Sequence, residues 1–277
     1  MAKKKRNTYW AKRIARHQHR LADKSIEETN KQIKRYYSIS MKSVIAAFEA
    51  TYDKLLATVT DGREPTPADL YNLDKYWQLQ AQLRDELQKL GDRESELLSK
   101  QFEKTWYQIY NSVALKSGTQ FSTVDKEMVQ QMINSVWCAD GKTWSERVWT
   151  NTERLAETLN DELINCVVTG KQTRDLKNLL QERFDVSYRQ AESLVTTEIA
   201  HIQVQASARR YEDYGLDEYE FFAETDEKTC KICGKLDGKE FRYSEMRIGV
   251  NAPPMHPRCR CDILPVIPKD IKLMINK

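Results

Sequence analysis

The residues best suited to chemistry form a Cys/His cluster near the end of the 277-residue chain. Cys230 and Cys233 form a Cys-x-x-Cys motif followed by a glycine, and His256, Cys259 and Cys261 come after a gap. Two thiolates with this spacing can point at one ion, and a second Cys/His pair completes a tetrahedral zinc site. The spacing predicts one structural Zn²⁺ bound by Cys230, Cys233 and two of the other three residues.

Other uses of this cluster remain open. A redox dithiol would lie at a strand-to-helix turn of a βαβ unit, whereas this motif follows a helical region. A catalytic zinc needs three ligands and an open position, usually beside an acid. A host-type nucleic-acid-binding zinc protein would carry a recognition helix with a different Cys/His spacing. The number of donors favours a closed structural site, and a metal-dependent nuclease or other hydrolase is the alternative function.

Long helices must position this cluster, because 9 glycines and 7 prolines are few for 277 residues and 31% of the residues are charged. Glycines such as Gly170 and Gly215 are placed as expected of helix ends. A cap residue followed by proline at Thr66-Pro67, and capping boxes at Thr143 and Ser187, predict helix starts. The expected helices cover about 8–60, 66 to a break at Gly91, 92–116, 124–139, 143 onward, 173–184 and 187 onward.

The character of the chain changes after Gly215. Segments 218–225, 240–243 and 261–267 are predicted to be short strands, because they are rich in aromatic and β-branched residues. The predicted fold is predominantly α with a C-terminal α+β zinc-binding module. The predicted domains are a basic arm at 1–20, a helical region with long amphipathic helices at 21–140, and a domain at 141–277, which comprises helices at 143–214 and the zinc module at 215–267.

The basic arm carries eight positive side chains and no acid. It has a net charge of +8, which leaves −5 for the rest of a chain with net charge +3. Such an arm favours a polyanion as partner, and the alternatives are a solvated tail or docking onto an acidic protein surface. The spacing is interpreted as spreading around a helix, which suits a flexible contact with DNA phosphates. The predicted DNA-binding residues are Lys3, Lys4, Lys5, Arg6, Lys12, Arg13, Arg16 and Arg20.

Glu198 is the one acid that falls inside an apolar stripe, between Ala191 and Ile202 on the helix expected to start at Ser187. A carboxylate on a buried face requires a partner. We predict that Glu198 is buried and structural, and that it fixes this helix to the zinc module through backbone amides or an arginine. The alternative is that the edge of the stripe is wet at this position.

The remaining reactive residue types support no catalytic assignment. Cys138 and Cys166 are expected to lie within helices as ordinary buried cysteines, and His17 and His19 are expected to be solvated. No apolar run approaches the roughly 18 residues needed to cross a bilayer, and no apolar stretch follows the basic start of the chain. We therefore expect no enzyme activity, no signal peptide and no membrane partner.

Several motifs in residues 145–267 together resemble the head morphogenesis proteins of tailed bacteriophages, a family typified by the F protein of phage Mu. The order and spacing of these motifs make the resemblance specific. They are Gly170, Asp175-Leu176, Leu179-Leu180, Phe184-Asp185-Val186-Ser187, Ala191-Glu192, Thr197-Glu198, Cys230-x-x-Cys233, Leu236-Asp237-Gly238 and His256-Pro-Arg-Cys259-Arg-Cys261.

The resemblance implies a non-enzymatic minor head protein, present in a few copies per procapsid, that acts in assembly at the portal and in handling or delivery of packaged DNA. The implied partners are the portal protein, double-stranded DNA, and the scaffolding or major capsid protein. The implied location is the virion, inside the head near the portal. During assembly, the implied location is the host cytoplasm. Some relatives carry a toxin or transferase domain after the cysteines, and we expect none here because only ten residues follow Ile267.

One departure from the family pattern concerns the residue before the Thr-Glu pair. The family commonly has arginine there, and this chain has Thr196. The resemblance implies that another group, such as Arg258 or Arg260, serves Glu198 in its place, or that no such group is needed.

Overall fold

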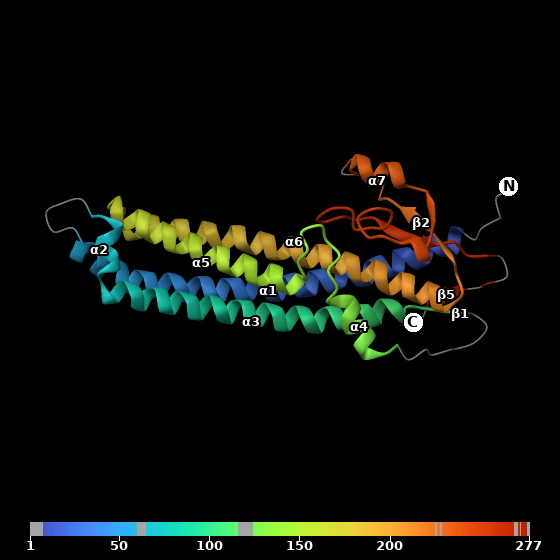
Figure 1. The fold of residues 1–277 in the computed structure, drawn as a ribbon, viewed down its shortest axis with the longest axis horizontal. Coiled ribbons are helices and arrows are strands. Elements are labelled where there is room, and N and C mark those ends of the chain that lie inside the picture. The colour runs from blue at the N-terminus through green and yellow to red at the C-terminus, as the bar shows by residue number, and fades with distance from the viewer. Residues whose placement is uncertain are drawn as a thin grey trace. The chain divides into compact units, whose positions relative to one another are not determined.

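The computed structural model describes residues 8–59, 65–115, 124–224, 226–227, 229–268, 271 and 273–275 (Figure 1). Its helices are α1 (Thr8–Val59), α2 (Pro67–Tyr71), α3 (Asp74–Tyr110), α4 (Lys126–Ile133), α5 (Trp144–Val168), α6 (Thr173–Asp213) and α7 (Lys231–Leu236). Its strands are β1 (Val113–Leu115), β2 (Glu218–Phe222), β3 (Glu240–Arg242), β4 (Asp262–Pro265) and β5 (Leu273–Ile275). The fold is thus mostly helical with short strands, as predicted. Within these residues no helix is both long and apolar enough to cross a membrane.

The chain forms two compact units, each built from segments that are far apart in sequence. The helical unit comprises Asn30–Leu97 and Ser145–Glu192. The mixed unit comprises Met1–Thr29, Leu98–Trp144 and Ser193–Lys277. The Cys/His cluster and both small sheets lie in the mixed unit.

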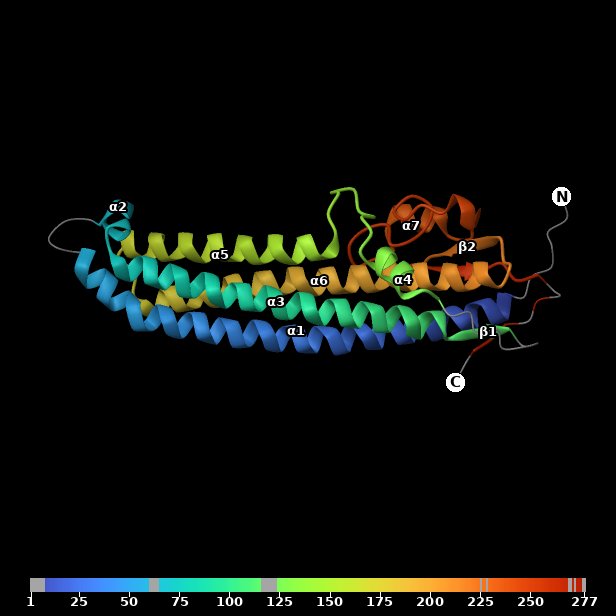
Figure 2. The same cartoon turned by 60° about the horizontal axis from the view of Figure 1, so that its bottom comes forward.

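In the helical unit, segments of α1, α3, α5 and α6 lie side by side as a four-helix bundle (Figures 1 and 2). One buried polar residue from each helix takes part in a shared cluster of hydrogen bonds. The Tyr37 hydroxyl donates to Glu94 at 3.3 Å, and the Asn151 amide donates to the Tyr37 oxygen at 2.8 Å and to the Ser187 carbonyl at 3.2 Å. Apolar side chains at three-to-four spacing fill the rest of the core. They include Ile33, Val44, Phe48, Leu79, Leu83, Leu87, Val148, Leu155, Leu159, Leu176, Leu180 and Phe184.

Helix α3 runs unbroken through Gly91, so the expected break at this glycine is wrong. A Cβ atom at Gly91 would lie 2.5 Å from the ring of Trp149 on α5, closer than packed atoms allow. The glycine therefore serves close packing between two helices. The expected start at Thr66-Pro67 is confirmed, but that helix ends at Tyr71 and α3 begins at Asp74.

Helix α6 is also continuous where the capping box at Ser187 predicted a new start. The two helices expected at 173–184 and from 187 are one helix, and Ser187 is buried inside it with its carbonyl bonded to Asn151. Packing of the bundle overrides the local capping preference, because Phe184 and Ala191 must reach the core on the same side of one helix.

Glycines end helices α5 and α6, as predicted. Gly170 and Gly215 have φ values of 63° and 70°, which favour glycine. The residue after each glycine donates its N–H back into the last turn, from Lys171 to Cys166 at 2.9 Å and from Leu216 to Tyr211 at 3.1 Å. The expected start of α5 at Thr143-Trp144 is likewise confirmed.

The mixed unit contains two antiparallel sheets, with strand orders β3-β2-β4 and β1-β5. The strands predicted at 218–225, 240–243 and 261–267 are confirmed as β2, β3 and β4 in shortened form, and Thr225 lies outside the described residues. The three-stranded sheet packs with α6 and the start of α1 around a core that includes Ile14, Ala15, Val204, Tyr211, Tyr219, Tyr243, Ile263 and Leu264.

The two cysteines outside the cluster differ in placement. Cys166 is buried in α5, as expected. Cys138 lies in the loop between α4 and α5 and is half-buried, so its expected place in a helix is wrong. The helix expected at 124–139 already ends at Ile133.

Candidate metal centre

The first half of the cluster is a knuckle at the start of α7. Cys230 caps this short helix, and its sulfur accepts the N–H of Cys233 at 3.3 Å. The Gly234 N–H donates to the Cys230 carbonyl at 3.0 Å. These bonds hold the two thiols on the same side of the turn. Cys233 is buried, whereas Cys230 is half-buried.

The turn after α7 ties this knuckle to the sheet and explains the Leu236-Asp237-Gly238 motif. Gly238 has a φ of 73°, a conformation that favours glycine, and its N–H donates to the Phe221 carbonyl of β2 at 2.9 Å. The Asp237 carboxylate accepts the Ala223 N–H at 2.9 Å. The knuckle is thereby fixed against the end of β2.

The second half of the cluster is a turn that leads into β4. The Cys259 N–H donates to the His256 carbonyl at 3.1 Å. Arg258 has a φ of 58°, and its N–H donates to the Thr197 hydroxyl of α6 at 3.0 Å. Because β4 pairs with β2, this turn is brought to the knuckle, with Cys259 and Cys261 both buried.

The side chains of the two halves meet at the distances of a tetrahedral metal site. The Cys233 sulfur lies 3.6 Å from His256 Nε2 and 3.9 Å from the Cys259 sulfur. Zinc bonds of about 2.3 Å to sulfur and 2.0–2.1 Å to nitrogen give edges of roughly 3.5 to 3.8 Å in such a site. The donor atoms form two groups that share Cys233, one with Cys230 and His256 and one with Cys259 and Cys261. The five predicted donors are therefore brought together, and the cluster could hold a metal ion.

The histidine is oriented for coordination by a backbone carbonyl. His256 Nδ1 lies 2.9 Å from the Pro257 oxygen, which can only accept a hydrogen bond, so Nδ1 carries the proton. The lone pair is then on Nε2, which faces Cys233. A hydrogen bond from the second ring nitrogen is the usual way in which proteins orient metal-binding histidines.

Hydrogen bonds and burial separate the pKa values of the four thiols. The Cys233 N–H lowers the pKa of Cys230, and a hydrogen bond from Cys261 lowers the pKa of Cys259 to about 5. Burial raises the pKa of Cys233 to about 12, and the hydrogen bond with Cys259 raises the pKa of Cys261. A low thiol pKa favours the thiolate, which is the form that binds metals. The cluster thus favours a thiolate in each of its two halves.

The walls of the cluster are apolar. Phe221, Ala223, Leu236, Phe241 and Met255 pack around the cysteines. Among the described residues, neither donor group includes a carboxylate. This environment is typical of a closed structural site rather than of a site that activates water.

Asp262, next to the last cysteine, is a buried polar residue that sequence reasoning missed. It is fully buried, and it accepts hydrogen bonds from the Gln203 amide at 2.7 Å and from the Ile263 N–H at 2.8 Å. His19 of α1 is half-buried, and its Nε2 atom lies 3.9 Å from a carboxylate oxygen of Asp262. The expected solvation of His19 is therefore wrong. Burial raises the pKa of Asp262. No local signal marked this residue, because its neighbours come from α1 and α6.

Glu198 of α6 is 2% exposed and accepts a hydrogen bond from the Trp137 indole at 3.0 Å. The Trp137 ring stacks on His201 with centroids 4.4 Å apart, one turn along the helix. Arg260, considered as a partner for Glu198, instead forms a two-pronged pair with Asp226 at 2.6 and 2.7 Å. Glu198 therefore links α6 to the loop between α4 and α5, where no partner was expected.

We predict that Glu198→Ala lowers the free energy of unfolding by about 1–3 kcal/mol, because it leaves the Trp137 indole N–H without this acceptor. Glu198→Gln retains an acceptor oxygen and should lose less. Glu182→Ala, at an exposed position of the same helix, is the control. Urea unfolding would measure all three, and equal stability of Glu198→Ala and the unsubstituted chain would contradict a structural role.

The four described cations of the predicted basic arm lie on one face of α1. Lys12, Arg13, Arg16 and Arg20 are exposed, and at about 100° per residue they fall within roughly a 100° arc. The interpretation that they spread around the helix is therefore wrong. The opposite face, with Ile14 and Ala15, is buried in the core of the mixed unit. Lys3, Lys4, Lys5 and Arg6 lie outside the described residues.

One comparison with known proteins covers the part of the chain that carries Glu198 and the Cys/His cluster. Residues 157–264 match the family described as phage Mu protein F like protein, which confirms the resemblance noted in the sequence. An NAD(+)-arginine ADP-ribosyltransferase of Enterococcus faecalis is 23% identical over 153 residues, which cover 53% of this chain and 31% of that relative. The chain thus spans about a third of the length of this curated relative. No solved structure matches the chain.

Proposed function

We propose that this chain is a minor head protein that acts in procapsid assembly at the portal and in handling packaged DNA, because residues 157–264 match the family described as phage Mu protein F like protein. The family match carries the proposal, because the matched range contains the whole of α6, Glu198 and all five donors of the cluster. It supports a structural component of a phage head.

The cluster serves this function as a structural zinc site. The proposed ligands are Cys230, Cys233, His256 and Cys259, since His256 and Cys259 lie at tetrahedral edge distances from Cys233. Cys261 lies beside them and donates a hydrogen bond to Cys259. A bound zinc would join α7 to the start of β4 and so hold the loop-rich end of the mixed unit on α6.

The basic face of α1 supports the DNA contact. Lys12, Arg13, Arg16 and Arg20 present four positive charges on one exposed surface, with Tyr9 exposed on the same side. Such a surface neutralises phosphates without reading bases. Sequence preference is therefore not expected.

Replacing these four cations with glutamine should weaken binding to double-stranded DNA and reduce the slope of log affinity against log salt by up to about 3.6, at about 0.9 per phosphate contact. Deletion of residues 1–20 is a poorer test, because it removes Ile14 and Ala15 from the core. The measurement is a fluorescence titration with two unrelated duplexes.

The matched control removes the same charge from exposed positions farther along α1, which are Lys31, Lys34, Arg35 and Lys42. It should retain most of the affinity and the original salt slope. If both variants bind DNA equally well, the basic face has another partner, such as an acidic portal surface.

The portal contact is tested in cells infected by the phage that encodes the chain. A tagged copy should retain the portal protein, identified by mass spectrometry, when procapsids are dissociated. Recovery of scaffolding or major capsid protein without the portal protein would contradict the proposed location inside the head near the portal.

The alternative, a metal-dependent hydrolase, receives no specific support from the site. Its donors are four thiols and one imidazole, and the similarity to an ADP-ribosyltransferase does not point to hydrolysis. DNA or ester hydrolysis that survives purification and disappears in His256→Ala would favour the enzyme over the structural protein.

A further inference from the structure

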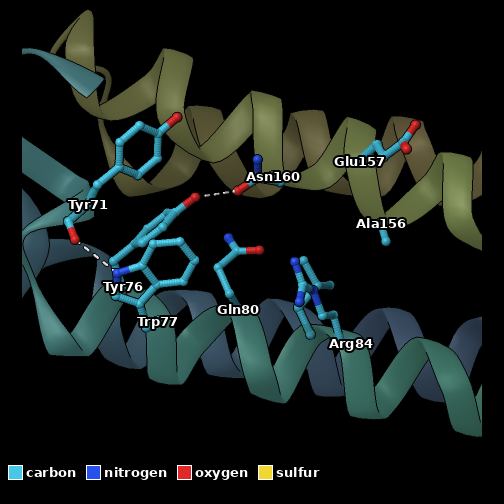
Figure 3. A pocket seen from close by; sticks show the side chains of 9 residues that line it. Tyr71, Tyr76, Trp77, Gln80, Arg84, Ala156, Glu157 and Asn160 are labelled. Carbon is cyan, nitrogen blue, oxygen red and sulfur yellow. Dashed lines mark hydrogen bonds between the residues drawn. The ribbon is translucent and has the colours of Figure 1, made fainter. Parts of the chain in front are cut away.

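A pocket of about 360 Å³ opens in the helical unit between α2, α3 and α5, far along the chain from the Cys/His cluster (Figure 3). Its wall is formed by Tyr71 of α2 and by Tyr76 and Trp77 of α3. Gln80 and Arg84 continue the wall along α3, and α5 closes the opposite side (Figure 3). The volume is at the lower end of the roughly 300–1,000 Å³ found for ligand pockets, which suits one large side chain with its backbone.

The aromatic wall is held in place although much of it faces solvent. Trp77 is 52% exposed and Tyr71 is 46% exposed. The Trp77 indole donates to the Tyr71 carbonyl at 2.9 Å, and the buried Tyr76 donates to Asn160 of α5 at 2.8 Å. The Tyr76 ring meets the rings of Tyr71 and Trp77 edge to face, with centroids 5.6 and 5.1 Å apart. These contacts fix the rings before any ligand arrives, which lowers the entropic cost of binding.

Gln80 supplies a polar group that lacks a partner. Its side chain is 6% exposed, and its Nε2 atom is buried without a hydrogen bond to any described residue. Figure 3 shows this amide projecting into the space between the aromatic rings and Arg84. A buried donor without an acceptor is costly, and an oxygen atom of a ligand would satisfy it.

We propose that this pocket is the docking site for a protein partner, which inserts an aromatic side chain against Trp77 and places acidic or carbonyl oxygens on Gln80 and Arg84. Trp, Tyr and Arg are the residues most enriched at the energetic centres of protein interfaces. A polyanion is disfavoured, because the lining contains one cation, Arg84, and one anion, Glu157, and so carries no net positive charge. The inference rests on neither the zinc site nor the assignment to a phage head.

The test uses the full chain labelled with ¹⁵N. Three small-molecule probes are added to it in separate titrations. They are the capped dipeptide N-acetyl-Tyr-Asp-amide, the capped dipeptide N-acetyl-Ala-Ala-amide, and adenosine monophosphate. NMR spectra would follow the indole N–H of Trp77 and the side-chain amide of Gln80. We expect both signals to shift with the Tyr-Asp probe, with a dissociation constant in the millimolar range, and to remain unchanged with Ala-Ala.

Two variants connect the signal to the pocket. Trp77→Ala and Gln80→Leu should each weaken binding of the Tyr-Asp probe at least about tenfold. Gln80→Leu should not lower the melting temperature, because it removes an unpaired buried donor. Tyr9→Ala, at an exposed aromatic residue of the mixed unit, should bind the probe as the unsubstituted chain does. Absence of any shift with Tyr-Asp at about 10 mM, or an equal or larger shift with adenosine monophosphate, would overturn the proposal.

Discussion

Substitution of Cys233 by serine is expected to abolish zinc binding and to loosen the loop-rich end of the mixed unit. Cys233 belongs to both groups of donors, and its sulfur is the atom that His256 and Cys259 approach. Thiolate sites couple metal binding to folding, with apparent binding free energies of roughly 10–16 kcal/mol in small zinc domains. Loss of the ion should therefore remove most of the stabilisation between α7 and the start of β4.

Elemental analysis would measure zinc content, and hydrogen exchange would measure protection of the amides. We expect about one zinc per chain in the unsubstituted protein and none in Cys233→Ser. The amides of β2, β3 and β4 should lose protection, while the four-helix bundle of the helical unit should retain it.

Three further cysteine variants sharpen this test. Cys138→Ser, outside the cluster, should retain zinc. Cys259→Ser should lose it, whereas Cys261→Ser should retain it with reduced affinity, because Cys261 is proposed to lie beside the ligands. Retention of zinc in Cys259→Ser with loss in Cys261→Ser would exchange the roles of these two residues. A full complement of zinc in Cys233→Ser would contradict the site itself.

Replacing Glu94 with glutamine is expected to stabilise the helical unit at alkaline pH by about 3 kcal/mol. Glu94 is 1% exposed, and burial raises its pKa from the ordinary 4.5 to about 7, against a smaller opposing effect of the Tyr37 hydroxyl. The folded chain thus holds this proton up to about pH 7, whereas the unfolded chain releases it near pH 4.5. The difference between the two pKa values corresponds to about 3 kcal/mol.

The sign of the pH dependence follows from this difference. Between about pH 4.5 and pH 7 the unfolded state binds fewer protons than the folded state, so the contribution of Glu94 to stability falls as pH rises through this range. Above pH 7 the loss is complete and the contribution is constant. Glu94→Gln stays neutral and retains an oxygen for Tyr37, so this part of the pH dependence should disappear.

Urea unfolding at pH 5.5 and pH 8 would test this prediction. The unsubstituted chain should lose more stability between the two values than Glu94→Gln does. Glu96→Gln, at an exposed position of the same helix, should behave like the unsubstituted chain. The contradicting result is a difference in the free energy of unfolding, between Glu94→Gln and the unsubstituted chain, that is the same at both pH values. Glu94 would then not titrate in this range.

Features that depend on neighbouring residues were predictable from the sequence. The Cys-x-x-Cys motif and the His-Pro-Arg-Cys-Arg-Cys segment predicted all five residues of the cluster that could hold a metal ion, because ligand spacing in a metal knuckle is set by local backbone geometry. Gly170 and Gly215 marked helix ends, because the left-handed conformation at these positions favours glycine over any residue with a side chain. The three strands of the larger sheet were recognisable from their aromatic and β-branched composition.

Features that depend on packing between distant segments were decided by the tertiary structure. Gly91 and Ser187 look like helix boundaries in sequence, yet close approach of Trp149 and burial in the bundle place both inside continuous helices. Residues 8–29 pack with the C-terminal segments in the mixed unit. This packing leaves four cations on one exposed face of α1 and buries Asp262 near His19. The burial of the Gln80 amide likewise could not be predicted from the sequence, because it depends on packing against α5, which is distant along the chain. Burial and close contact are properties of the assembled core, and residues that meet there have no required spacing along the chain.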